Sequence, residues 1–178
     1  MREMKRKLTE KEYFGEINPE ALRREDNIIR TLALTFTGMM KELEKEYGEG
    51  VVDVARRGFL KAKIEADKQV FESIPEKTVT SYCNWLNSIL HLTHEFEVEC
   101  NEDGTECRYT FKACPWAKHF REFGGEKYGR FFCDADRPMV EAFSDDLGFK
   151  ITKVLMDGED CCDHYFYSKS ALKDRENE

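Results

Sequence analysis

Cysteine, histidine and acidic side chains at suggestive spacings are the residues of this 178-residue chain best suited to chemistry. Cys114 directly precedes Pro115, which suits the first position of a helix, so Cys114 is expected at the helix N-cap. The free amide N–H groups and the dipole at a helix N-terminus stabilise a thiolate. The pattern predicts a thiol that is nucleophilic near neutral pH; a small buried residue at a strand-to-helix corner is the alternative.

A second candidate site lies in the run Cys162-Asp163-His164. Residues two apart on a strand face the same side, so a thiol and an imidazole would lie together there. Such a pair could polarise a nucleophile or coordinate a metal, and a satisfied core histidine beside a buried cysteine is the other interpretation. Cys133 and Asp136 lie about one helical turn apart and are expected to face the same cavity.

Zinc has to be considered for a chain with seven cysteines and four histidines. The sequence has no CxxC pair, and none of its cysteine spacings is normal for structural zinc. His91 and His94 are interpreted as surface or capping residues. One zinc site remains open as an alternative, formed by Cys114, Cys133, Cys162 and His164.

The odd number of cysteines predicts reduced thiols rather than a disulfide framework. The basic start of the chain is not followed by an apolar stretch, so we expect no signal peptide and a cytoplasmic protein. Cys100 and Cys107 would lie close together across a hairpin, but in a reducing cytosol we expect no bond between them.

Helices are expected to fill the first half of the chain, residues 1–94. Asn18 and Pro19 suit the start of a helix whose apolar stripe continues to Gly48. Further helices are expected over about 51–74 and 81–94. The long helices offer a surface for a homodimer.

A period of two begins at Glu95, and Asp103-Gly104 is typical of a two-residue hairpin turn. Charge and apolarity choose the same register. The predicted pairs are Phe96–Phe111, Val98–Tyr109, Cys100–Cys107, Glu99–Arg108 and Glu95–Lys112.

A second hairpin is expected near the end, with strand residues from Phe149 to Leu155, a turn at Asp157-Gly158, and a return over 161–167. This arrangement puts Cys162 and His164 on the apolar face. Two short helices are expected between the hairpins, followed by a last turn capped by Asp136. The chain is thus predicted to be one α+β domain over 1–178, with N-terminal helices packed on a mainly antiparallel sheet (95–168) and a polar tail (169–178).

Composition narrows the function classes. The net charge of -8 argues against a nucleic-acid partner, and no apolar run approaches the roughly 20 residues that span a bilayer. The sequence contains no P-loop, dinucleotide fingerprint or GxSxG elbow. A small-molecule substrate or ligand is the remaining expectation.

Three blocks in the second half of the chain, between about Phe96 and Tyr167, resemble the L-2-amino-thiazoline-4-carboxylic acid hydrolase family. The usual acidic pair of the last block appears here as Glu159-Asp160. The blocks are Cys114-Pro115-Trp116-Ala117, Phe132-Cys133-x-x-Asp136 and Leu155-Met156-x-Gly158-x-Asp160-Cys161-Cys162-Asp163-His164.

This resemblance implies hydrolytic opening of a cyclic amidine-like thiazoline to a carbamoyl-cysteine. Cys114 would attack the ring carbon or hold it for water, and His164 would act as general acid and base, oriented by Asp136 or Asp163. Two further cysteines would line the pocket or hold a metal. The implied catalytic set is Cys114, Cys133, Asp136, Cys162 and His164.

The family is also distantly similar to vinyl-reductase-type ligand-binding domains, which pair N-terminal helices with an antiparallel sheet. That similarity implies a small-molecule sensor or binding module as the alternative function.

Overall fold

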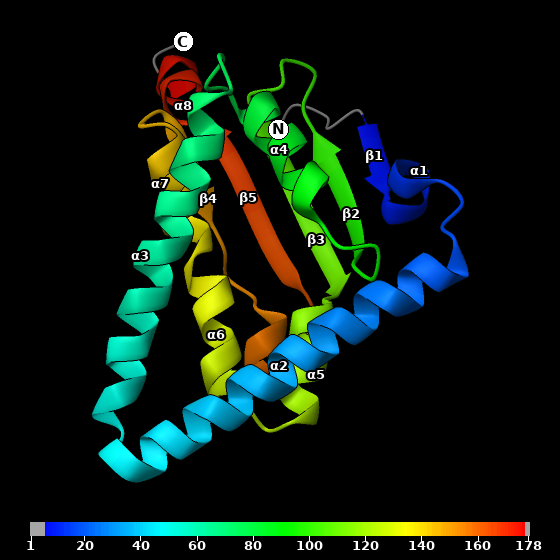
Figure 1. Ribbon diagram of the computed structural model, residues 1–178. Helices are drawn as coiled ribbons and strands as arrows, with labels where there is room; N and C mark the ends of the chain where they lie inside the picture. The colour runs from blue at the N-terminus through cyan, green and yellow to red at the C-terminus, as the bar shows by residue number, and fades with distance from the viewer. Residues whose placement is uncertain (1–5, 177–178) are drawn as a thin grey trace.

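Within residues 6–176, which this computed structural model describes, five strands form one antiparallel sheet that helices cover on one face (Figure 1). The strand order is β1-β2-β3-β5-β4, so β3 is the central strand. The strands are β1 (Arg6–Thr9), β2 (Glu95–Cys100), β3 (Glu106–Ala113), β4 (Leu147–Lys150) and β5 (Cys162–Ser168). The predicted α+β class is confirmed.

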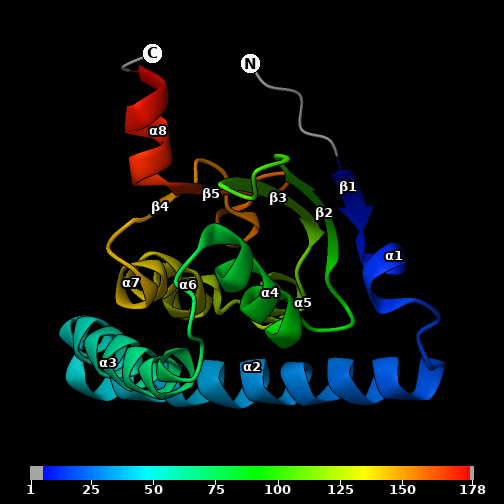
Figure 2. The same ribbon diagram turned by 90° about the horizontal axis from the view of Figure 1, so that it is seen from above.

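The helices form two layers on the sheet (Figure 2). Helices α4 to α7 lie between the sheet and α2, and α2 packs against α5, α3 and α6. The long N-terminal helices therefore form an outer layer. The helices are α1 (Glu10–Phe14), α2 (Pro19–Tyr47), α3 (Gly50–Glu72), α4 (Val79–Ile89), α5 (Pro115–Glu122), α6 (Glu126–Asp134), α7 (Asp136–Phe143) and α8 (Lys169–Glu176).

Helix α2 begins and ends at the residues that its sequence predicts. The Asn18 side chain accepts a hydrogen bond from the Glu20 amide (2.8 Å), and Pro19 is the first helical residue. Gly48 ends the helix with φ of 79°, which glycine adopts without steric strain. Helix α4 ends earlier than predicted, at Ile89, where a turn brings the amide of Leu92 to the Glu25 carboxylate (2.7 Å).

The β2–β3 hairpin has the predicted register, including Phe96 opposite Phe111. Its loop is longer than the expected two residues, because the chain leaves β2 after Cys100 and re-enters the sheet at Glu106. The predicted Glu95–Lys112 pair is wrong. An irregularity after Glu95 shifts the register there, and Lys112 instead donates to Glu97 (2.6 Å).

The second hairpin is only partly as predicted. Phe149 pairs with Phe166, which is the register expected for a hairpin turn centred on Asp157-Gly158. However, β4 ends at Lys150. The amides of Thr152 and Lys153 donate to the Asp163 carboxylate (2.7 and 2.6 Å) rather than to a strand partner. The chain then forms a short 3₁₀ helix, η1 (Leu155–Asp157), instead of a continued strand.

Two terminal segments differ from their predictions. Residues 6–9, expected in a helical half, form β1 at the edge of the sheet and pair with β2. The segment after residue 168, expected to be a polar tail, forms α8. Arg175 of this helix donates hydrogen bonds to the Thr105 side chain (2.9 Å) and to Glu106. These contacts hold the polar segment against the β2–β3 hairpin.

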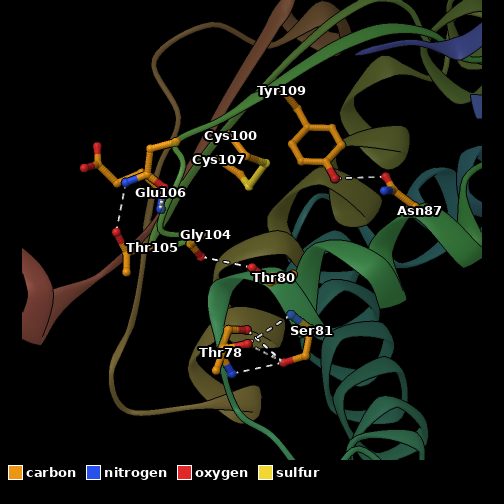
Figure 3. Close-up of a disulfide and its surroundings, with 11 residues drawn as sticks. Thr78, Thr80, Ser81, Asn87, Cys100, Gly104, Thr105, Glu106, Cys107 and Tyr109 are labelled. Atoms are coloured by element: carbon orange, nitrogen blue, oxygen red, sulfur yellow. Dashed lines mark hydrogen bonds between the residues drawn. A yellow bond between two sulfur atoms is a disulfide. The ribbon is translucent and has the colours of Figure 1, made fainter. Parts of the chain in front are cut away.

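Cys100 and Cys107 form a disulfide between β2 and β3, which corrects the expectation that all seven thiols are reduced (Figure 3). The hairpin register places the two residues directly opposite each other, with Cα atoms 4.1 Å apart. The same end of the hairpin is held to α4 by the Thr80 hydroxyl, which donates to the Gly104 carbonyl (3.1 Å). The other five cysteines are free.

The helices nearest the sheet pack closely because one position lacks a side chain. A Cβ atom on Gly129 of α6 would lie 2.6 Å from the Phe120 ring of α5 and 2.7 Å from the Met156 methyl group. Phe120 is fully buried, so it has little room to move. Glycine at this position therefore sets the separation of α5 and α6.

We expect Gly129→Ala to lower the free energy of unfolding by about 1–3 kcal/mol, because overpacking outweighs the better helix propensity of alanine. Gly58→Ala in α3 is the matched control, since nothing lies within 4 Å of a Cβ there. That variant should gain about 0.5–1 kcal/mol. Urea unfolding measures both changes, and similar effects of the two substitutions would contradict this packing argument.

Candidate functional site

Four elements of the inner layer and the sheet carry the five residues that the sequence singles out. Cys114 lies at the N-cap of α5, directly after β3. Cys133 lies in the last turn of α6, and Asp136 is the first residue of α7. Cys162 and His164 lie on β5, where they face Phe111 and Tyr109 of β3.

A buried histidine holds α5, the helix that begins at Cys114, against α2. The His119 side chain is 2% exposed and lies between two carboxylates. Its Nε2 is 2.8 Å from Asp26 of α2, and its Nδ1 is 3.1 Å from Glu122 of α5. Arg30 of α2 donates to the same Glu122 (3.0 Å), so charged hydrogen bonds connect the two helices.

Asp136 interacts electrostatically with the other four of these residues, and we call the five together the cluster. Its Oδ2 lies 3.6 Å from Nε2 of His164. Its negative charge also adds to the effect of burial in raising the pKa values of three thiols, which requires those thiols to lie nearby. They are Cys114, Cys133 and Cys162. The structure therefore places Asp136 beside His164 and within electrostatic range of the three thiols.

The carboxylate of Asp136 does not cap a helix, contrary to the prediction. The N-cap of α7 is Ala135, and no side chain caps the first turn. Burial raises the pKa of Asp136 to about 7, against the lowering effect of Arg130 and Lys63. Near neutral pH this side chain is about equally protonated and ionised.

His164 has the opposite shift. Burial lowers its pKa to about 4, although the charge of Asp163 acts in the other direction. The rings of Phe111 and Phe149 lie against the imidazole, with centroids 5.1 and 5.3 Å from it. The imidazole is therefore neutral at pH 7 and can accept a proton.

Asp136 rather than Asp163 is the acid that faces His164. The Asp163 carboxylate is occupied by the amides of Thr152 and Lys153, so it holds the loop between β4 and η1. The sequence left both acids open as partners of the histidine. The loop contacts favour Asp136 for that role.

The predicted stabilised thiolate at Cys114 is wrong in direction. The amides of Trp116 and Ala117 lower the pKa of this thiol, as a helix N-terminus should, but the larger effect of burial raises it to about 11. Burial also raises the pKa of Cys162 to about 12, against a hydrogen bond from the Leu155 amide to its sulfur (3.2 Å). At neutral pH these sulfurs are thiols.

Cys114 connects the cluster to a surface cleft of about 700 Å³. The cleft lies where α1, the start of α2, the β2 and β3 ends and α5 meet. Leu22, Leu92 and Leu155 supply apolar walls. The positively charged lining residues are Lys11, Arg23, Lys112, Lys118 and Arg121.

His94 is a cleft residue that sequence reasoning missed. It accepts a hydrogen bond from the His91 amide (3.1 Å), which agrees with the capping interpretation, but it is 8% exposed and lines the cleft. Burial lowers its pKa to about 4, and the charges of His91 and His164 lower it further. Its spacing from His91 was visible in the sequence, whereas its burial was not.

The zinc alternative gains no support from the arrangement. Among the residues that the structure describes, no group of three or more His, Cys, Asp or Glu side chains is arranged to hold a metal ion. The described helices include none that is long and apolar enough to cross a membrane.

The titrations of Asp136 and His164 should change the free energy of unfolding in opposite directions as pH rises. Between pH 3.8 and about 7 the folded protein keeps a proton on Asp136 that the unfolded chain has lost, so this contribution to stability falls as pH rises. Between about pH 4 and 6.5 the unfolded chain holds a proton on its histidine that folded His164 lacks, so this contribution rises with pH. In the wild type the two nearly cancel.

We therefore expect Asp136→Asn to make the free energy of unfolding rise with pH between 4.5 and 6.5, relative to wild type, by on the order of 1 kcal/mol per pH unit. His164→Asn should make it fall by a similar amount. Urea titrations across this range measure both slopes, with Glu141→Gln, a substitution of an exposed acid on α7, as the control. Variants whose slopes match the wild type would refute the protonation states assigned above.

Comparison with known proteins identifies the family. No curated protein sequence matches this chain closely. Among solved structures, trafficking protein particle complex subunit 3 from Naegleria fowleri, covalently bound to palmitic acid, aligns with a TM-score of 0.46 and 14% identity over 79% of this chain and 95% of that chain. The family model described as L-2-amino-thiazoline-4-carboxylic acid hydrolase matches residues 26–166, which include every residue of the cluster. The chain belongs to the L-2-amino-thiazoline-4-carboxylic acid hydrolase family.

Proposed function

We propose that this protein hydrolyses a cyclic amidine-type small molecule, such as L-2-amino-thiazoline-4-carboxylate, at the cluster of Cys114, Cys133, Asp136, Cys162 and His164. The family name supports a hydrolase. The observation that carries the proposal is the position of Cys114, which lines a cleft of about 700 Å³ and lies within electrostatic range of Asp136, the partner of His164. A cleft of this volume suits a small molecule.

The protonation states give the pair its roles. Asp136, with its pKa raised to about 7, supplies a proton, and the neutral imidazole of His164 accepts one. This division differs from the expectation that His164 performs both tasks while an acid orients it. The Cys114 thiol must lose its proton to a base before its sulfur can attack.

The reaction adds one water to the substrate. The Cys114 sulfur bonds to the ring carbon between nitrogen and sulfur, the ring carbon–sulfur bond breaks, and the released sulfur takes a proton. Water then attacks the same carbon and the bond to Cys114 breaks, which returns the enzyme thiol and gives a carbamoyl-cysteine with a free thiol. The amides of Trp116 and Ala117 favour negative charge at Cys114. The same amides are suited to stabilise the negative charge that develops as the substrate reacts.

Cys114→Ala should reduce thiazoline turnover at least about a hundredfold, because both the nucleophile and its position at the helix N-terminus are lost. Asp136→Asn should give a loss of similar size. Cys161→Ala is the matched control, since Cys161 is a free thiol next to Cys162 in the chain, and it should keep the wild-type rate. Mass spectrometry of the product, together with release of substrate thiol, follows the reaction.

Turnover by Cys114→Ala at the wild-type rate would exclude the covalent mechanism. A ligand-binding role without turnover is the second candidate, and one observation favours it: burial raises the pKa values of Cys114, Cys133 and Cys162, so these sulfurs are poor nucleophiles at rest. Native mass spectrometry of purified wild-type protein would then show a retained small molecule, with no product formed from added thiazoline.

A further inference from the structure

Helix α2 presents an apolar stripe to solvent. Ile28, Leu32 and Met39 lie on one side of the helix and are 52%, 50% and 52% exposed. Their spacing of four and seven residues, with Thr35 between them, forms a single seam. In Figure 2 the sheet and α4 to α7 all lie on one side of α2. The buried residues of α2, which include Ile29, Ala33 and Met40, lie on a different side of the helix from this exposed seam. A seam of three half-exposed large apolar side chains is typical of an interaction surface.

The charges at the two ends of this face are opposite in sign. Arg24 lies near the start of α2, and Glu42 and Glu46 lie near its end. Such a face complements itself when a second copy runs in the antiparallel direction, because each basic end meets an acidic end. A parallel copy would place Arg24 against Arg24.

We propose that α2 is a homodimer interface, in which a second copy packs its α2 antiparallel across a two-fold axis near the middle of the stripe. The axis lies midway between Leu32 and Thr35, which puts each of these residues opposite the other in the second copy. The same symmetry puts Ile28 opposite Met39 and brings Arg24 beside Glu42. An isologous contact of this kind uses one surface patch twice.

The contact between the two copies would follow most of α2. Residues 20–46 give a contact about 40 Å long at 1.5 Å per residue. A contact of one helix pair lies near the small end of specific interfaces, so we expect a dissociation constant of about 1–10 µM. This inference is independent of the proposed hydrolase function.

Sedimentation equilibrium of the full chain between about 1 and 200 µM tests the interface. We expect a monomer–dimer equilibrium for the wild type and a shift of at least about tenfold toward monomer for Leu32→Glu. Leu34→Glu is the matched control and should keep the wild-type equilibrium. Leu34 is also exposed, at 46%, but lies two residues on, about 200° around the same helix. Both positions are exposed, so each variant chain should fold.

A charge exchange tests the antiparallel orientation. Arg24→Glu and Glu42→Arg should each weaken the dimer about tenfold by placing like charges together, and the double variant should restore it. The Glu42 pair with Lys45, 3.6 Å apart and exposed, contributes little and is no obstacle to this comparison. A wild type that stays monomeric to 200 µM, a Leu32→Glu variant that dimerises like wild type, or a double variant without recovery would each overturn the proposal.

Discussion

The antiparallel pairing of β3 with β5 is the constraint on which the candidate site depends. It sets His164 opposite Tyr109 and Cys162 opposite Phe111, with these side chains toward the helices. Because side chains alternate along a strand, a slip of one residue would turn both away from the core. The same strand β3 leads directly into Cys114 and α5, so the sheet register also fixes the start of that helix.

Burial then determines the protonation states of the side chains in the cluster. The side chains at the junction of β5, α5, α6 and α7 are largely shielded from water, although Asp136 is still 24% exposed, and the loss of hydration disfavours their charged forms. Asp136 consequently holds its proton to about pH 7, His164 stays neutral, and the thiols stay protonated. The result is a cluster with little net charge, whose chemistry depends on moving protons between neighbours.

Side-chain hydrogen bonds to the backbone determine where regular structure stops around this cluster. Asp163 takes the amides that would extend β4, and the Cys162 sulfur takes the amide that starts η1. On the outer side, His119 fixes α5 to α2 through Asp26. The residues nearest the cluster in sequence thus shape the backbone, and α2 supports the helix that carries Cys114.

The sequence by itself determined the elements whose signals are local. The Asn18-Pro19 start, the Gly48 end and the β2–β3 register follow from capping, glycine geometry and alternation, which act within a few residues. The sequence also supplied all five cluster residues, through three short motifs. It missed β1 and α8, because pairing with β2 and contacts of Arg175 stabilise segments that have weak preferences of their own.

Only the tertiary structure decided which groups are buried together and what charge they carry. The helix N-terminus at Cys114 does favour a thiolate, as its sequence position indicates, yet the surrounding layers remove water and raise the pKa instead. His94 and Asp136 gain their environments in the same way, from segments far apart in the chain. Desolvation is a property of the whole packed assembly, so no spacing of residues along the sequence could report it.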